Sequence, residues 1–370
     1  MDKPKKYIGT KYLTYAEKRN IDLPFESYEV KRTIDLYVLL AAGYLRLKGK
    51  PNHQLVNLHN DLNFNDCIGF HLWNATSFSK KPWVTTLELP CVESSRLEHL
   101  SRHQCKRIYC ISSWVMDYQK NLLAESPYRD LILPKLELLH PSQNLNINES
   151  DLTSKDFTET LRFIFVGRDF FRKGGYECVK AFTEIVNQGF DAELIIVSQL
   201  TTYDYPNPAP KENLEHAIKL IEDSQDKIKF FKELNNQEVL ALISKSHVGL
   251  LPTYNDSYGY SVLEFFSCGC PVITTSILAL SEINHQDRGW LIDMPLFETE
   301  YPMKIIDRSS PDKVKRISDL LTESLTEILS SILTDRSQLS SKSIASLKYV
   351  KLNHSQVKNI KTLEQIYGTF

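Results

Sequence analysis

Several features that would assign a chain to a class at once are missing from these 370 residues. The longest apolar run, Leu36 to Leu45, spans about ten residues, whereas a membrane-spanning helix needs roughly twenty. No apolar segment follows the first basic residues, so the start does not resemble a secretory signal. Seven cysteines, an odd number without framework spacing, argue against a disulfide scaffold. We therefore expect a soluble cytoplasmic protein with reduced thiols.

Neither sign of charge dominates, since 44 Lys and Arg stand against 46 Asp and Glu. The net charge of −2 gives no indication of a nucleic-acid partner. Residues 1–50 are the exception, with eleven basic and six acidic side chains. This local excess is typical of a solvated surface, and it also suits contact with an anionic membrane surface or an acidic acceptor. A peripheral position at the inner membrane face is therefore a second expectation for the location.

Signatures of nucleotide and metal binding are also missing. The chain has no Gly-Lys-Ser/Thr of a Walker A loop and no Gly-x-Gly-x-x-Gly dinucleotide fingerprint. It has no Asp-x-Asp pair for a nucleotide-bound metal. Cys268 and Cys270 flank a glycine, where small residues at a helix–strand corner are a simpler explanation than metal ligands. We expect no metal and no cofactor.

Strands and helices alternate regularly after residue 160. Polar residues dominate from Pro141 to Thr160, which we interpret as a linker. The apolar run from Leu161 to Val166 then predicts a strand that ends at Gly167. Further strands are expected at 192–197, 228–231, 247–251 and 272–274, and helices at 175–187, 214–221, 237–244 and 260–268. This alternation predicts an α/β fold with a parallel sheet covered on both faces, whose ligand binds at the carboxyl ends of the strands.

The first half of the chain gives a weaker pattern. Residues 54–58, 83–87 and 107–111 are candidate strands of a second such sheet, and residues 1–50 give no firm strand order. At the other end, four apolar residues recur at helical spacing and predict a packed helix over the last fifteen residues: Val357, Ile360, Leu363 and Ile366.

Two clusters of polar residues fall at the carboxyl ends of expected strands. In the first, a glycine turn at Gly167 is followed by Arg168, Lys173 and the start of a helix. Backbone N–H groups, the helix dipole and two full positive charges form a site suited to a diphosphate. A basic loop in an unrelated Rossmann-like domain remains the alternative.

The second cluster places Asp256 in a loop and Glu264 on the helix that follows, before the corner at Gly269 and Pro271. Two acids spaced in this way suit a ligand with a sugar at one end and a nucleoside at the other. For Asp256 alone, a helix cap or an Asx turn is the alternative. For Glu264, the alternative is an ordinary surface acid.

Together these clusters resemble the family 4 retaining glycosyltransferases of the GT-B fold. The segments 229–238, 280–283 and 289–292 also resemble that family, so the likeness covers residues 161–293; it is weak over 83–145 and absent over 1–50. The resemblance implies two Rossmann-like domains facing each other across a cleft. It implies an acceptor-side domain at 1–155, a donor domain at 156–345, and a C-terminal helix at 346–370 that packs back on the first domain.

The resemblance also implies roles for individual residues. Arg168 and Lys173 would hold the donor diphosphate and stabilise it as the leaving group, and Asp256 would contact the transferred sugar. The family usually has Glu where this chain has Asp256. Glu264 would accept hydrogen bonds from the ribose hydroxyls. The full set expected to bind the donor is Gly167, Lys232, Leu234, Ser257, Tyr258, Gly259, Tyr260, Ser261 and Glu264.

The implied activity is retaining, metal-independent transfer of a hexosyl or related sugar from a UDP- or GDP-sugar to a glycan or lipid-linked glycan, as in cell-surface polysaccharide biosynthesis. The missing Asp-x-Asp pair argues against a GT-A transferase. A nucleotide-sugar epimerase, or a degenerate GT-B protein that acts as a nucleotide-sugar-binding or partner subunit, remains the alternative. The acceptor-side catalytic residue stays undecided among His59, His71, Glu88, His99 and His103.

Overall fold

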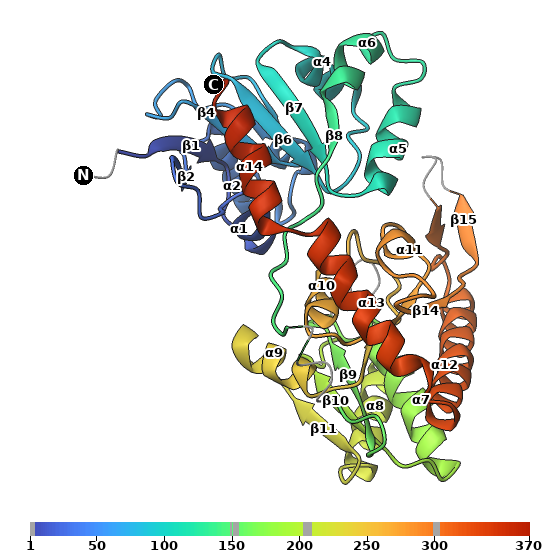
Figure 1. Ribbon diagram of the computed structural model, residues 1–370. Coiled ribbons are helices and arrows are strands. Elements are labelled where there is room, and N and C mark those ends of the chain that lie inside the picture. The colour runs from blue at the N-terminus through green and yellow to red at the C-terminus, as the bar shows by residue number, and fades with distance from the viewer. Residues whose placement is uncertain (1–3, 149, 151–154, 203–208, 299–303) are drawn as a thin grey trace. The chain divides into compact units, whose positions relative to one another are not determined.

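The computed structural model describes residues 4–148, 150, 155–202, 209–298 and 304–370 (Figure 1). The chain divides into two compact units. Unit 1 comprises Met1–Ser142 with His354–Phe370, and unit 2 comprises Gln143–Asn353. The predicted α/β fold with two Rossmann-like domains is confirmed, because each unit contains a six-stranded parallel sheet.

The sheet of unit 1 has the strand order β2-β1-β4-β6-β7-β8. Its strands are β1 (Lys6–Thr10), β2 (Tyr28–Arg32), β4 (Gly69–Trp73), β6 (Trp83–Leu87), β7 (Cys105–Cys110) and β8 (Leu136–Leu138), and a separate pair joins β3 (Leu58–His59) to β5 (Thr76–Ser77). The helices are α1 (Tyr15–Asn20), α2 (Leu36–Lys48), α3 (His53–Val56), α4 (Ser94–Ser101), α5 (Ser113–Leu122), α6 (Arg129–Ile132) and α14 (Gln356–Tyr367), with a 3₁₀ turn at Leu133–Lys135.

Successive residues of β6 enter two different cores of this unit. Trp83 packs on one face of the sheet with Phe70 and Leu72, and Val84 packs on the other with Ile8 and Tyr109. All five residues of β6 are buried, and four of them are β-branched or aromatic, as suits a strand covered on both faces; the strand predicted at residues 83–87 is confirmed. The predicted C-terminal helix is confirmed as α14, whose Leu363 and Tyr367 belong to the second of these cores.

One strand predicted for the first half is wrong. Residues 54–58 do not form a strand; α3 ends at Val56 and β3 begins at Leu58. The cause is local, because the Asn52 side chain accepts hydrogen bonds from the N–H groups of Gln54 (3.0 Å) and Leu55 (3.2 Å). An asparagine that captures these donors starts a helical turn in spite of the apolar residues that follow.

The sheet of unit 2 has the strand order β11-β10-β9-β12-β13-β14. Its strands are β9 (Leu161–Val166), β10 (Ala192–Val197), β11 (Ile228–Phe231), β12 (Val248–Leu251), β13 (Val272–Thr275) and β14 (Gly289–Ile292), with a small antiparallel pair β15 (Leu296–Glu298) and β16 (Lys304–Ile306). The helices are α7 (Gly175–Asn187), α8 (Lys211–Asp223), α9 (Asn236–Ser244), α10 (Tyr260–Ser267), α11 (Leu280–Ile283), α12 (Pro311–Thr334) and α13 (Gln338–Asn353). Every strand and helix predicted between residues 161 and 274 is confirmed, with ends that differ by at most a few residues.

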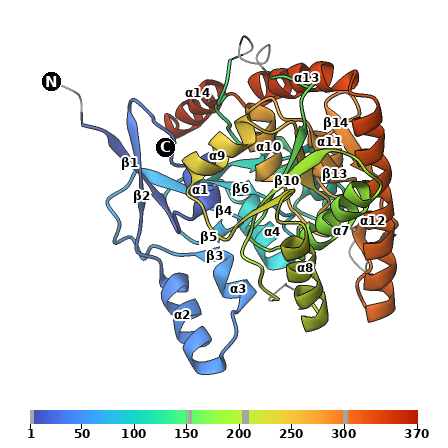
Figure 2. The same cartoon turned by 90° about the horizontal axis from the view of Figure 1, so that it is seen from below.

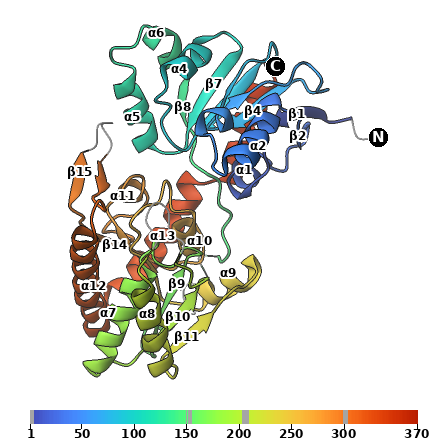
Figure 3. The ribbon, with the colours of Figure 1, turned by 180° about the vertical axis from the view of Figure 1, so that it is seen from behind.

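Two groups of helices cover this sheet. The helix α7 packs against α8 and α12, and α10 packs against α9 and α13 (Figure 3). The chain moves from β9 to β10 in one direction across the sheet and from β12 to β13 in the other. Because crossovers between parallel strands are right-handed, the connecting helices α7 and α10 lie on opposite faces of the sheet. The strand order therefore reverses between β9 and β12, and ligands of open α/β sheets bind at such a reversal.

Candidate functional site

The loop after β9 is shaped by two glycines. A side chain at Gly167 would place its Cβ 3.0 Å from Cβ of Lys173, so the glycine lets the loop fold back on itself. Gly174 has a φ of +78°, and a Cβ there would lie 2.2 Å from the Pro252 carbonyl oxygen. Only glycine fits a left-handed conformation at such a close approach. The loop therefore delivers Lys173 to the start of α7 against the end of β12.

Arg172 ties the loop after β9 to the loop after β12. Its guanidinium forms an ion pair with Asp169 and donates to the Asn255 carbonyl at 3.0 Å. Its own carbonyl accepts from the Tyr254 N–H at 2.9 Å and from the Thr253 hydroxyl at 3.0 Å. The sequence did not predict a role for Arg172 or Thr253. Arg172 belongs to the run of cations at 168–173, but its partner Asn255 lies 83 positions away.

Lys173 and Asp256 form an ion pair at the reversal of strand order. Their side chains are 16% and 11% exposed, so solvent and ligand can reach the pair. Asp256 Oδ1 also accepts from the N–H groups of Gly259 (2.9 Å) and Tyr258 (3.4 Å), which is an Asx-type turn before α10. Asp256 thus forms the Asx turn that was the alternative explanation for this residue. It also links its own loop to the loop after β9 through Lys173.

The contacts of Asp256 decide its charge. Burial opposes ionisation, but the Lys173 charge, the hydrogen bond from Lys173 and the Gly259 N–H outweigh it and hold the pKa of the carboxyl below its ordinary value. Near neutral pH Asp256 is therefore ionised, and Lys173 has a fixed negative partner.

Two helix N-termini meet the same edge of the sheet. The helix α7 follows the β9 loop and α10 follows the β12 loop, and these two strands are neighbours. Gly259 precedes α10 with a φ of +83°, and a Cβ there would lie 2.4 Å from Leu280. The positive ends of both helix dipoles therefore reinforce the Lys173 charge, which favours an anionic ligand group.

The remaining predicted donor residues lie along this edge at different distances from the ion pair. Arg168 is exposed and follows β9 directly. Tyr258 is buried, whereas Ser257, Tyr260, Ser261 and Glu264 are partly buried around the start of α10. Lys232 and Leu234 follow β11, which β10 separates from β9, so they lie further along the edge. The structure therefore joins Lys173, Tyr258 and Gly259 to Asp256 by direct contacts, and it places Lys232 and Leu234 two strands away from Lys173's strand.

The candidate acceptor-side histidines of unit 1 are mostly occupied by protein contacts. His71 lies within β4, its two ring nitrogens bonded to Tyr367 (2.6 Å) and Thr86 (2.7 Å), and burial lowers its pKa to about 3. His59 bonds Ser77 at 2.8 Å, and burial lowers its pKa to about 4. His99 is buried, with the centre of its ring 4.0 Å from that of Phe78, whereas His103 is exposed.

Glu88 differs from these histidines because it follows β6 at the carboxyl edge of the unit 1 sheet. Its Oε2 accepts from the Trp73 indole N–H at 3.0 Å, and the side chain is partly buried. Glu88 thus follows a strand of the large sheet at the edge where ligands of such sheets bind.

In the described ranges, no three His, Cys, Asp or Glu residues are grouped closely enough to ligate a metal ion. Among the helices that the structure describes, none combines the length and the apolar composition needed to cross a bilayer.

Sequence comparisons point to the same region as the site. Residues 160–300 match the family model of the glycosyl transferases group 1. The capsular polysaccharide biosynthesis glycosyltransferase CapM of Staphylococcus aureus is 25% identical over 136 residues, which is 35% of this chain and 32% of that protein. The chain thus matches about a third of the length of this curated relative.

Solved structures extend the likeness of fold to the whole chain. A glycosyltransferase from Rickettsia africae has a TM-score of 0.59 at 14% identity, with 98% of each chain covered. HepE of Anabaena, solved in complex with UDP, has a TM-score of 0.60 at 10% identity and covers 99% of this chain and 100% of its own. Residues 160–300 thus match the group 1 glycosyl transferases, within a chain that has the fold of the GT-B glycosyltransferases.

Proposed function

We propose that this protein is a retaining glycosyltransferase that moves a sugar from a UDP- or GDP-sugar to a glycan or lipid-linked glycan. The observation that carries the proposal is the Lys173–Asp256 ion pair, which lies at the reversal of strand order beside two helix N-termini. The match of residues 160–300 to glycosyl transferases supports it. So does the likeness to a relative that is described as a capsular polysaccharide biosynthesis glycosyltransferase.

In this proposal the donor diphosphate binds at the loop between β9 and α7. A lysine ammonium has three donors, so Lys173 can keep Asp256 and still bond a phosphate oxygen. Arg168 supplies the second cation from the exposed start of the same loop. The bond between the anomeric carbon and the diphosphate breaks as the bond to the acceptor oxygen forms on the same face. The acceptor proton passes to a phosphate oxygen, and the two cations stabilise the departing charge without a metal.

Asp256 acts mainly by orienting Lys173. A carboxylate offers about four lone-pair positions. The contacts from Lys173, Tyr258 and Gly259 use three of them. One position remains for a hydroxyl of the transferred sugar. Glu264 on α10 and the N–H groups near Tyr260 and Ser261 are assigned to the ribose and to the sugar or phosphate, and Lys232 and Leu234 to the nucleobase side.

The acceptor side of the proposal includes contact with a membrane surface. The helix α2 lies beside α3 in unit 1 (Figure 2). It has no buried residue, and two of its apolar side chains are strongly exposed, Leu39 at 64% and Leu47 at 84%. Residues 36–50 contain no acid, and Arg46, Lys48 and Lys50 are basic. Apolar side chains flanked by cations suit the interface of an anionic bilayer.

Sedimentation with vesicles tests this membrane contact. The double variant Leu39→Glu with Leu47→Glu should lose binding to vesicles that contain anionic lipid. Val357→Glu is the matched control, because Val357 is an exposed apolar residue of another helix of the same unit. Equal binding of the two variants, or no binding by the wild-type protein, would remove the membrane from the proposal.

Thermal shift with UDP, GDP and their sugars, followed by donor turnover, tests the transfer activity. A ligand at a hundred times its Kd stabilises the folded state by about 2.7 kcal/mol, so the cognate nucleotide should be evident. Slow hydrolysis of the donor or transfer, with the anomeric configuration retained in the product, is expected. Inversion at the anomeric carbon would rule out the retaining mechanism.

The binding-subunit alternative is favoured by one observation, the commitment of most of the Asp256 carboxylate to protein contacts where the family usually has Glu. Nucleotide binding without hydrolysis or transfer would support that alternative. Conversion of the bound sugar to its epimer would indicate the epimerase.

A further inference from the structure

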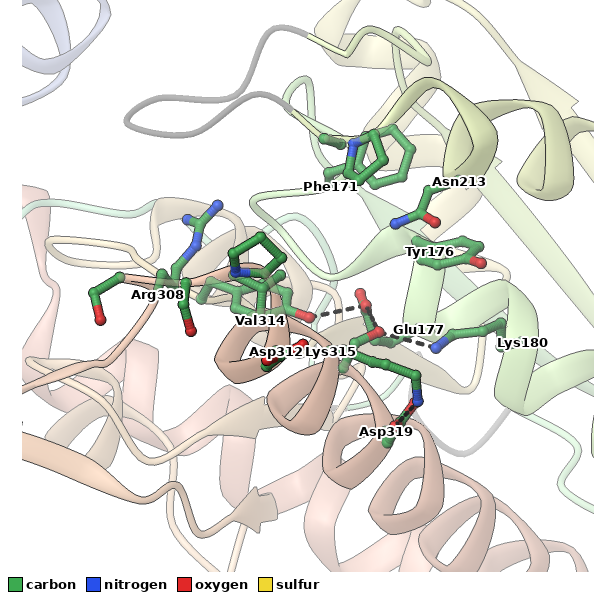
Figure 4. Close-up of a pocket in the computed structure, with 17 residues that line it drawn as sticks. Phe171, Tyr176, Glu177, Lys180, Asn213, Arg308, Asp312, Val314, Lys315 and Asp319 are labelled. Carbon is green, nitrogen blue, oxygen red and sulfur yellow. Dashed lines mark hydrogen bonds and ion pairs between the residues drawn. The ribbon is translucent and has the colours of Figure 1, made fainter.

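We propose that unit 2 contains a second binding site, for a neutral saccharide, in a cavity between α7 and the start of α12. The cavity has a volume of about 650 Å³, within the range of roughly 300–1,000 Å³ usual for small-molecule sites. Its walls include the start of α7, the residues that open α8, and Tyr254 from the loop after β12 (Figure 4). This site goes beyond the proposed transfer activity and has a separate set of residues.

Aromatic side chains form much of the wall. The ring centres of Phe171 and Tyr176 lie 5.8 Å apart. The Arg308 guanidinium lies over the Tyr254 ring, 5.2 Å from its centre. All three rings are more than nine-tenths buried, so their positions are fixed by packing. Flat apolar surfaces with polar edges suit a sugar ring, which has C–H groups on its faces and hydroxyls at its edge.

A buried carboxylate lies at the base of this wall. Glu177 is 2% exposed, and its Oε1 accepts from the hydroxyls of Tyr254 (2.8 Å) and Ser318 (2.5 Å). Within the described part of the chain, its Oε2 has no hydrogen-bond partner, although it is buried. A buried acceptor left without a donor is unfavourable, and a ligand hydroxyl that reaches this oxygen would satisfy it. Figure 4 shows Glu177 lying among the other labelled lining residues.

The charges around the cavity cancel. Among its described lining residues, three are acidic and three are basic: Glu177, Asp312, Asp319, Lys180, Arg308 and Lys315. Lys315 pairs with Asp319 at 2.6 Å, and Lys180 donates to the Ser318 hydroxyl at 2.9 Å. The positive end of the α12 dipole is offset by Asp312 in its first turn. This balance favours a neutral ligand over a phosphate or an amine.

The loop that carries Lys173 forms part of the cavity wall. None of the groups proposed to hold the donor lines the cavity. Phe171 stands two positions before Lys173, and the Tyr254 N–H bonds the Arg172 carbonyl at 2.9 Å. A saccharide in the cavity therefore contacts the reverse side of the donor loop. Such a site could hold either a free sugar or a saccharide unit of a glycan chain, since both present the same hydroxyls.

Saturation-transfer NMR tests the proposal, with glucose, galactose, N-acetylglucosamine and maltose as free probes and a neutral polysaccharide as the polymeric probe. Wild-type protein should bind at least one of them. Val314→Trp, at a partly buried lining position on α12, should fill the cavity and abolish the signal. Asn213→Ala should weaken binding ~2- to 10-fold, as loss of one hydrogen bond does. Val357→Trp, on α14, is the matched control and should bind like wild type.

The expected pattern separates this proposal from the transfer activity. Val314→Trp should keep the thermal shift given by UDP or GDP, and Lys173→Ala should keep the saccharide signal. Binding by the polymer alone would identify a glycan chain as the source, and binding by monosaccharides would identify a free sugar. No signal from any probe, equal signals from Val314→Trp and wild type, or stronger competition by a sugar phosphate than by the neutral sugar would overturn the proposal.

Discussion

Lys11 of unit 1 and Lys173 of unit 2 both follow the first strand of a six-stranded parallel sheet, and each pairs with an aspartate from another loop. In both sheets the strand order reverses beside that first strand. The pairs differ in access, because Lys11 and Asp35 are 2% and 0% exposed, whereas Lys173 and Asp256 are 16% and 11% exposed. Each sheet therefore has a lysine–aspartate pair after its first strand, and of these two pairs the one in unit 2 is open to a ligand.

The donors of Lys11 explain the difference. Besides Asp35 at 3.3 Å, its ammonium bonds the carbonyl oxygens of Val56 (2.8 Å), Leu55 (3.4 Å) and Leu58. Burial lowers the pKa of Lys11, and the charge of Asp35 only partly opposes this. Lys11 thus anchors the segment around α3 and has no donor left for a ligand. A lysine beside a strand reversal is evidence of a site only when its donors and its surface are available.

The largest expected effect is on the accessible pair. Charge-assisted hydrogen bonds are worth about 1.5–3 kcal/mol each, so loss of both cations in Arg168→Ala with Lys173→Ala should lower transfer by about 10²–10⁴-fold. Thermal unfolding should change little, because Arg168 is exposed and Asp256, without Lys173, keeps the hydrogen bonds from the Tyr258 and Gly259 N–H groups. Lys211→Ala, which removes an 85% exposed lysine of unit 2, is the control. Near-normal turnover in the double variant would contradict the proposed donor site.

The second effect falls on the buried pair. Lys11→Met leaves the Asp35 carboxylate buried without its partner, which should cost about 3–5 kcal/mol of unfolding free energy. Lys31→Met breaks an exposed pair with Glu29 in the same unit and should lower the unfolding free energy far less. Denaturant unfolding can be followed in a Trp290→Phe background, where the remaining tryptophans, Trp73, Trp83 and Trp114, all lie in unit 1. Equal costs for the two lysines would remove the distinction between the pairs.

Acid should destabilise unit 1 more steeply than unit 2. Burial lowers the pKa of His59 to about 4 and of His71 to about 3, against roughly 6.5 for an unfolded histidine. Below pH 6.5 the unfolded chain binds two protons that the folded unit does not, so stability falls as pH falls. The slope approaches about 2.7 kcal/mol per pH unit near pH 5. In unit 2, burial lowers the pKa of His247 to about 4, which gives about half that slope.

The variant His71→Gln in the Trp290→Phe background checks this pH dependence. Unfolding free energies measured at pH 6.5, 5.5 and 4.5 should show a slope reduced by about half relative to the parent. An unchanged slope would mean that His71 is not the buried neutral group described here.

The smallest effect is expected from Asp256→Glu. The longer carboxylate keeps the negative partner of Lys173, and it matches the residue usual in the resembling family. Transfer should therefore stay within about tenfold of wild type, which corresponds to roughly 1.4 kcal/mol. A loss as large as that of the double cation variant would show that the position of Lys173 depends on the short side chain of aspartate.

The sequence predicted unit 2 better than unit 1 for local reasons. The apolar run Leu161–Val166 is bounded by a polar linker and by Gly167, so both ends of β9 could be placed. By contrast, β1 combines two exposed residues with three buried ones, β2 is mostly polar, and Asn52 starts a helical turn inside an apolar pattern. Local signals of this kind decide where elements begin and end.

Contacts between residues far apart in the chain could not be predicted from the sequence. Lys173 and Asp256 were both predicted as site residues, but they are 83 positions apart, so the sequence did not predict their ion pair. The same holds for Lys11 with Asp35, and for Glu177 with Ser318, which are 141 positions apart. Only the strand order brings such groups together. The contact that orients Lys173 and the carboxylate of the saccharide cavity are therefore contributions of the structure.

Calorimetric titration of UDP and GDP into wild-type protein and Lys173→Ala tests the central claim most directly. If the Lys173–Asp256 pair marks the diphosphate site, one nucleotide should bind the wild type, and the variant should bind it ~10- to 150-fold more weakly. The variant should unfold at the same temperature as the wild type in the absence of nucleotide. Equal affinity of the two proteins for the nucleotide would contradict the account.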